Sequence, residues 1–224
     1  MSNLTDALET ISKWLEQNKP ELFASLQPGL SINEIEAKVQ VLLPARLPVE
    51  MYDLYQWRNG TNRESNPIII QVDGLICECH EGSFYISFGS GRAFQAFSAL
   101  YFRPLDFIGV FRHKRATLLE VFSHHNASFV TCSNEQQVTS PLLGSDTEYC
   151  YSEVYPSATN LFLELAEALS SGVIFIDKGI LSIDTQKEKA LSQKYGKHWG
   201  EEVDMGDYEN ESGCSYLIHL SNRL

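Results

Sequence analysis

Residues 26–62 have the sequence LQPGLSINEIEAKVQVLLPARLPVEMYDLYQWRNGTN, from which two short helices and their ends can be predicted. Ser31 and Glu34 form a capping box, in which the hydroxyl accepts a hydrogen bond from a backbone N–H and the carboxylate reaches back to the N–H of Ser31. A helix is therefore predicted to begin at Ser31. Pro48 is predicted to begin the second helix, since the N–H that proline lacks has no intrahelical partner in a first turn.

Both helices carry apolar residues at helical spacing, and both have a predicted end. The first stripe ends at Pro44, whose ring interrupts helical hydrogen bonding. The second ends at Asn59-Gly60, which we expect to form a left-handed cap. The stripe of the first helix comprises Ile32, Ile35, Val39 and Leu42, and the face of the second comprises Met51, Leu54, Tyr55 and Arg58.

The order of these features resembles the amino-terminal signature of the Smi/Knr family of the SUKH superfamily. The resemblance continues in Tyr155-Pro156-Ser157 before an apolar helix, in Gly172 before a short strand, and in a lysine-rich helix that ends near Tyr195 and Trp199. It covers most of the chain and is least clear in residues 63–137. The resemblance implies an α+β fold. It also implies a binding role, because bacterial SUKH proteins are immunity proteins against toxins and fungal relatives regulate cell-wall synthesis.

Composition predicts a cytoplasmic protein with its own core. The chain has 224 residues, 43% of them hydrophobic, and contains no apolar run near the roughly 20 residues that span a bilayer. An amphipathic helix is predicted at the start, with its stripe at Leu4, Leu8, Ile11 and Leu15. The five cysteines are an odd number without a secretion signal, which favours reduced thiols over disulfides.

The chain is acidic, with 17 basic and 29 acidic residues and a formal charge of −12. This charge disfavours nucleic-acid binding and favours basic protein partners. Six acids lie close together near the carboxyl end: Glu201, Glu202, Asp204, Asp207, Glu209 and Glu211. Such a run is most simply a solvated loop, and the alternative is a docking surface that steers a basic partner.

The remaining pattern predicts a single α+β domain with a mostly antiparallel or mixed sheet and helices packed against it. Strands are expected at 68–72, 84–88, 117–122 and 127–132, with one or two more between 138 and 154 and a last one at 215–220. Residues 99–111 are expected to form a strand followed by a short helix. The chain thus divides into a helical block at 3–60, a sheet-rich middle at 66–154, a helix and hairpin at 157–183, and a carboxyl-terminal helix with the acidic segment at 184–224.

No motif predicts a catalytic, cofactor or metal site. Cys77, Cys79 and His80 lack the second ligand pair that zinc sites use. A base and nucleophile formed by His124 or His125 with Cys132 would lack an orienting third group. Gly89-Ser-Gly91 falls short of a dinucleotide fingerprint and is better explained as a tight turn.

We therefore expect a non-enzymatic protein-binding module that exists as a monomer or weak dimer. The leading hypothesis is an immunity protein that binds a basic toxin domain through the six acids. The alternatives are an intracellular adaptor or regulatory scaffold, and a small enzyme whose site is assembled from distant residues. Trp57 lies off the apolar face of its helix, so it is a candidate interface anchor; Trp14 and Tyr55 are expected in the core.

Overall fold

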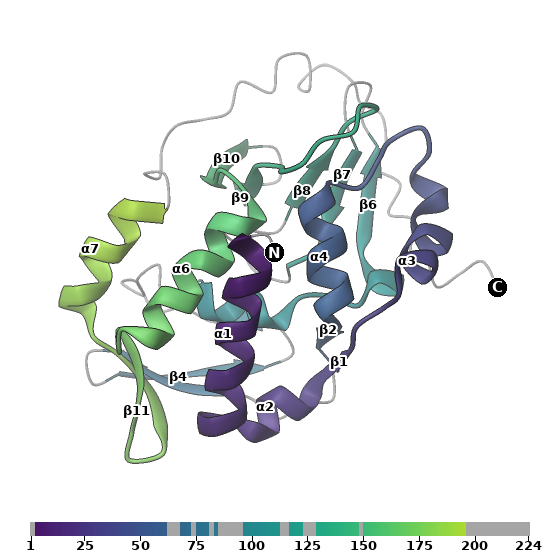
Figure 1. Cartoon of the computed structure of the whole chain (residues 1–224). Helices are drawn as coiled ribbons and strands as arrows, with labels where there is room; N and C mark the ends of the chain where they lie inside the picture. Colours follow the sequence, from purple (N-terminus) through teal and green to yellow (C-terminus); the bar gives the residue numbers. More distant parts are fainter. Residues whose placement is uncertain are drawn as a thin grey trace.

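The structure is a computed structural model, and it describes residues 3–61, 68–72, 75–80, 83–84, 96–112, 117–122, 129–147 and 150–195. Helices α1 (Asn3–Asn18), α4 (Val49–Trp57) and α6 (Ala158–Ser170) pack side by side, and β-sheets lie behind them (Figure 1). This combination of helices with largely antiparallel sheets confirms the predicted α+β fold class.

The predicted amino-terminal helices are present. In α1 the stripe of Leu4, Leu8, Ile11 and Leu15 is buried. Helix α2 (Pro20–Ser25) and strand β1 (Leu26–Pro28) lead to α3 (Ile32–Val39), which a 3-10 turn, η1 (Gln40–Leu42), extends. The capping box is confirmed, since the Ser31 N–H donates to Glu34 Oε2 over 2.8 Å and the Glu34 N–H donates to Ser31 Oγ over 3.3 Å.

Two details of this block differ from the prediction. Ile32 was expected on the buried stripe but is 55% exposed, because it is the first residue of α3 and lies beyond the core that Ile35 and Val39 enter. Asn59-Gly60 was expected to cap α4 but belongs to strand β2 (Arg58–Thr61), which pairs with β1. The helix ends at Trp57 because Arg58 already adopts an extended backbone.

The middle of the chain forms an antiparallel sheet in the order β10-β9-β8-β7-β6. The predicted hairpin is confirmed, because Thr117 pairs with Cys132 and Glu120 with Phe129. Residues 99–111 are the reverse of the prediction, with 3-10 turns first and a strand after them. The elements are η2 (Ala99–Tyr101), η3 (Leu105–Phe107), β6 (Gly109–Arg112), β7 (Thr117–Glu120), β8 (Phe129–Cys132), β9 (Leu142–Thr147) and β10 (Cys150–Tyr155).

A second sheet has the order β11-β12-β3-β4-β5, in which only β12 and β3 run parallel. The turn between β11 and β12 contains Lys178 and Gly179, both with positive φ, as tight hairpins require. Of the strand predicted at 84–88, only Phe84 is described; the strand predicted at 215–220 lies outside the described residues. The strands are β3 (Ile68–Val72), β4 (Leu75–His80), β5 (Ser83–Phe84), β11 (Ile174–Asp177) and β12 (Ile180–Ile183).

Helices α6 and α7 complete the fold. Ser157 caps α6 by accepting the Asn160 N–H over 3.0 Å, and Asp184 accepts the Lys187 N–H at the start of α7 (Thr185–Tyr195). A single cluster of buried side chains joins α1, α4 and α6 to both large sheets. Among the described residues, no helix has the length and apolar composition that crossing a bilayer requires.

Candidate functional site

Trp57, the predicted interface anchor, is half-buried at the end of α4. Its Nε1–H donates to Ser12 Oγ over 2.8 Å. Its ring stacks on Phe102 with centroids 6.4 Å apart and meets the edge of Phe162 at 6.3 Å. The indole therefore holds α4 against α1 and α6, and only the remaining exposed part of the ring is open to a partner.

The six acids of 201–211 lie outside the described residues, as do His124, His125 and the Gly89–Gly91 turn. Cys77, Cys79 and His80 lie in β4, but their side chains are outside the described set. Cys132 is described and fully buried, and burial raises the pKa of its thiol to about 12. A thiol with this pKa is protonated at neutral pH and does not act as a nucleophile. Within the described ranges no three metal-ligating side chains come together.

Most of the exposed large apolar side chains in the described part of the chain lie on segments that contact one another. Seven large hydrophobic residues are exposed in the described part of the chain, and six lie on α3, on η1 and the residue after it, on η3, at the start of α4 and in the segment before β9. We call these six residues the apolar edge: Ile32, Val41, Leu43, Val49, Phe107 and Val138. Single exposed apolar residues are ordinary, whereas a group on adjoining segments is typical of an interaction surface.

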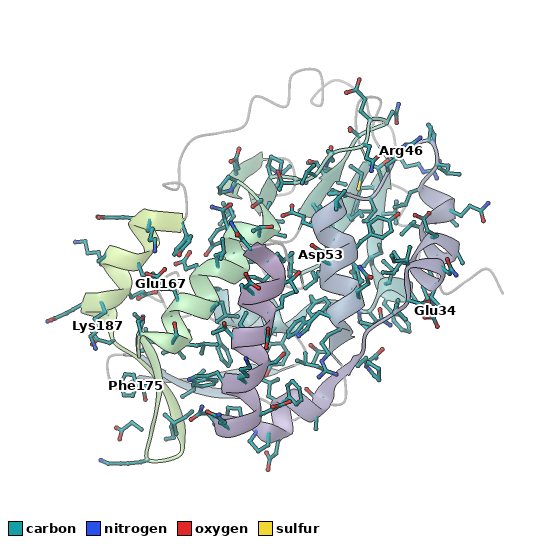
Figure 2. The ribbon with its side chains drawn as sticks, in the orientation of Figure 1. Glu34, Arg46, Asp53, Glu167, Phe175 and Lys187 are labelled. Atoms are coloured by element: carbon teal, nitrogen blue, oxygen red, sulfur yellow. The ribbon has the colours of Figure 1, made fainter. Side chains whose placement is uncertain are left out.

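Direct contacts join the segments that carry the apolar edge. The Val49 N–H donates to the Gln137 carbonyl over 3.1 Å, and the Arg46 N–H to the Ser133 carbonyl over 2.9 Å. Arg112, at the end of β6, donates to the Val41 carbonyl. The start of α4, the 133–138 segment, η1 and β6 therefore meet at one corner, which Arg46 marks in Figure 2.

A buried carboxylate anchors this corner. Glu50 is only 3% exposed and accepts four hydrogen bonds from two other segments. Its Oε1 accepts the N–H groups of Ser140 (2.7 Å) and Ala158 (3.3 Å). Its Oε2 accepts the N–H (2.9 Å) and the hydroxyl (2.8 Å) of Thr159. Glu50 therefore ties the start of α4 to the first turn of α6 and to the segment that carries Val138.

Burial also changes the acidity of Glu50. Desolvation raises the pKa of its carboxyl group, and the hydrogen bonds from Ser140, Thr159 and Ala158 oppose that rise. Negative charge at a helix N-terminus is favourable because the backbone N–H groups there lack intrahelical partners. The carboxylate is thus a structural anchor, and it fixes Val49 and Val138 in place.

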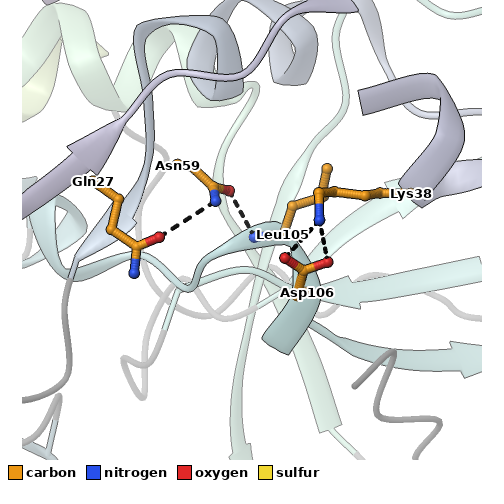
Figure 3. Close-up of polar contacts among 5 residues, drawn as sticks. All are labelled: Gln27, Lys38, Asn59, Leu105 and Asp106. Carbon is orange, nitrogen blue, oxygen red and sulfur yellow. Dashed lines mark hydrogen bonds and ion pairs between the residues drawn. The ribbon is translucent and has the colours of Figure 1, made fainter. Parts of the chain in front are cut away.

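A second polar cluster, shown in Figure 3, fixes η3, the turn that also carries Phe107. Asn59 Oδ1 accepts the Leu105 N–H over 3.0 Å, and its Nδ2 donates to Gln27 Oε1 over 3.4 Å. Lys38 donates to both carboxylate oxygens of Asp106, at 2.5 and 2.7 Å. These contacts hold η3 against β1, β2 and α3.

Gly60 allows this close approach. Its φ is +80°, and a Cβ at this position would lie 2.3 Å from the backbone nitrogen of Pro104. Only glycine combines that conformation with that distance. The Asn-Gly pair is therefore explained by the docking of β2 on the Arg103-Pro104 backbone.

Sequence reasoning missed most of the apolar edge. Val41, Leu43 and Val138 are ordinary apolar residues in the sequence, and Ile32 was assigned to the core. The exposure of these side chains depends on which distant segments of the chain pack beside them in the folded protein. The sequence Leu42-Leu43-Pro44 could have predicted one exposed leucine, because two adjacent leucines in a short turn cannot both point toward the core.

The chain is 30% identical over 73 residues to the glucan synthesis regulatory protein of Neurospora crassa. The match covers 33% of this chain and 14% of the relative, so the chain spans only a small part of that protein's length. No protein-family model and no solved structure matches the chain. The fungal match supports the resemblance to the Smi/Knr family over a third of the chain.

Proposed function

We propose that this chain is a protein-binding regulatory module of the Smi/Knr type within the SUKH superfamily, and that it acts as an adaptor without catalysis. The observation that carries this proposal is the apolar edge, since six of the seven exposed large hydrophobic residues of the described chain lie on adjoining segments. The name of the fungal relative supports a regulatory role.

The apolar edge is suited to recognition because its supports are rigid. Glu50 fixes Val49 and Val138, while Asn59 and the Lys38–Asp106 pair fix the turn that carries Phe107. A surface that is ordered before binding loses less conformational entropy when a partner docks. Apolar side chains surrounded by polar ones are also the usual composition of an interface core and its rim.

An immunity protein is the second candidate, favoured by the charge of −12 and the six acids of 201–211. In that function the acids would steer the chain to a basic toxin domain, and association would weaken as salt screens them. The regulatory function is preferred because the relative is named as a regulator. The predicted absence of catalysis stays part of the proposal.

A capture experiment separates these functions. The tagged chain is incubated with lysate of its own host, beside a Leu43→Ser/Val138→Ser variant and a sample with the six acids neutralised. The matched control is Phe175→Ser, since Phe175 is also exposed but lies far from Arg46 (Figure 2).

The proposal predicts a stoichiometric partner that is lost in the Leu43/Val138 variant and kept in the Phe175 variant. A partner that is lost only when the acids are neutralised would support the immunity function instead. A partner captured equally by every sample would contradict the proposed role of the apolar edge.

A further inference from the structure

The charges at one corner of the apolar edge are opposite in sign to the charge of the chain. Residues 38–49 contain Lys38 and Arg46 and no acid, and the acid that follows them, Glu50, is buried. Arg112 adjoins this segment through its bond to the Val41 carbonyl. We call the exposed residues of this region the basic corner: Val41, Leu43, Arg46, Val49, Arg112 and Val138.

The cations of this region differ in what they contact. Lys38 is neutralised by Asp106 at 2.5 Å. Arg112 donates to a neutral carbonyl, so its charge is not compensated by that bond. Arg46 is exposed and forms no ion pair with any described residue.

Among the described residues, no acid near the corner forms an ion pair with Arg46 or Arg112. Glu135 lies two residues from Ser133, whose carbonyl accepts the Arg46 N–H, but none of the ion pairs between described residues joins Glu135 to Arg46. Glu36 accepts the Tyr52 hydroxyl over 2.9 Å, and the charges of Glu36 and Arg46 shift the pKa of that hydroxyl in opposite directions, so Glu36 lies in the neighbourhood of Arg46 without forming an ion pair with it. Within the described part of the chain, Arg46 and Arg112 therefore have no ion-pair partner, and they adjoin the segments that carry Val41, Leu43 and Val138.

We infer that the basic corner binds a partner segment that combines acidic with large apolar side chains. Its apolar side chains contact Val41, Leu43 and Val138, and its carboxylates pair with Arg46 and Arg112. Arginine suits this role because its planar group can donate two parallel hydrogen bonds to one carboxylate. The inference rests on the proposed function and specifies the chemistry of its partner.

The same charges select against other segments. A neutral apolar segment would cover Arg46 and leave it without a counter-charge, and a basic segment would add repulsion. The overall charge of −12 attracts basic molecules at long range, whereas contact specificity is decided by the groups at the interface. The overall composition predicts a basic partner, whereas the basic corner favours an acidic one.

Binding of three labelled synthetic peptides to the full chain, followed by fluorescence anisotropy, tests this inference. The first peptide alternates short runs of glutamate and leucine, the second replaces glutamate with lysine, and the third replaces leucine with serine. Each is titrated at low and moderate salt. The protein variants are Arg46→Glu, Val138→Ser and, as a matched control on an exposed lysine of α7, Lys189→Glu; circular dichroism verifies that each is folded.

The inference predicts that the glutamate–leucine peptide binds and that the lysine-substituted and serine-substituted peptides bind at least several-fold more weakly. Arg46→Glu should weaken its binding roughly fivefold, and Lys189→Glu should leave it unchanged. Added salt should weaken it as well. The inference would be overturned if the glutamate–leucine peptide did not bind, or if the lysine-substituted peptide bound equally well.

The two proposals can fail separately. If capture from lysate depends on Leu43 and Val138 but the peptide does not bind, the protein-binding function stands and the acidic chemistry of the partner is wrong. If the peptide binds as predicted but no captured partner depends on those residues, the corner has the inferred chemistry and the proposed regulatory function is wrong.

Discussion

Replacing Glu50 with glutamine should destabilise the protein even though it removes a buried charge. The carboxylate accepts three backbone N–H groups and one hydroxyl through its two oxygens. Glutamine has one acceptor oxygen and one NH₂ group, so it cannot replace both. Its oxygen would keep Ser140 and Ala158, and its NH₂ would face Thr159.

The magnitude follows from the groups left unpaired. The Thr159 hydroxyl can rotate to accept from the new NH₂, but the part-buried Thr159 N–H would be left without an acceptor, at a cost of about 1–3 kcal/mol. The remaining hydrogen bonds become weaker because their acceptor is no longer charged. Part of this cost is offset, because the neutral side chain no longer carries the desolvation penalty of a buried charge. We expect Glu50→Gln to lower the free energy of unfolding by about 1–3 kcal/mol and Glu50→Ala by about 3–5 kcal/mol.

Urea denaturation at neutral pH measures both changes, with Glu16→Gln as the control because Glu16 is exposed on α1. Protonation of Glu50 favours the folded state, since folding raises its pKa. That contribution is complete below its unfolded pKa, about 4.5, and is lost as pH rises through the folded pKa. The advantage of the wild type over Glu50→Gln should therefore be largest at acidic pH. Equal stability of the two proteins at neutral pH, or an advantage that grows with pH, would refute the reasoning.

Three further predictions concern other parts of the fold. Gly60→Ala should lower the free energy of unfolding by more than about 4 kcal/mol, because the added Cβ would meet the backbone of Arg103 and Pro104. Gly172→Ala, where φ is +70° but the space around the Cβ is open, should lower it by only about 1–2 kcal/mol. Urea denaturation compares the two variants, and equal losses would contradict the close-approach explanation. Cys132 should resist alkylation at mildly basic pH until the chain unfolds, as peptide mapping can measure, because burial raises its thiol pKa; rapid labelling of the folded chain would contradict its burial. Glu167→Gln should change global stability by less than about 1 kcal/mol yet speed hydrogen exchange in α7, because Glu167 accepts bonds from Lys194 and Tyr195. Those bonds lower the Glu167 pKa, so the protection of wild-type α7 amides, after correction for the pH dependence of intrinsic exchange, should fall as pH falls through that pKa; protection that does not change with pH would count against the contact.

Local features of this fold were predictable from sequence, because their causes lie within a few residues. The Ser31 capping box, the Ser157 cap and the Lys178-Gly179 turn each follow from side chains and backbone conformations next to one another. The stripe of α1 follows from the regular spacing of its apolar residues. These features also sufficed for the α+β class.

Features with distant causes were not predictable. Asn59-Gly60 has the sequence of a helix cap, but its conformation is set by Leu105 and Pro104, more than forty residues later. Glu50 has the sequence of an ordinary acid in a first turn, and its role depends on Ser140 and Thr159. The exposure of Val138 likewise depends on which segment approaches it. The candidate site is therefore a product of the tertiary structure, whereas Trp57 was selected from helix periodicity alone.

Site-specific photo-crosslinking in host lysate tests the central proposal most directly. A photoreactive amino acid is placed at Val138 in one sample and at Phe175 in another, both of which are exposed in the wild type. A protein-binding role for the apolar edge predicts a discrete crosslinked species from position 138 that is absent from position 175. The same crosslinked species from both positions, or none from position 138, would contradict it.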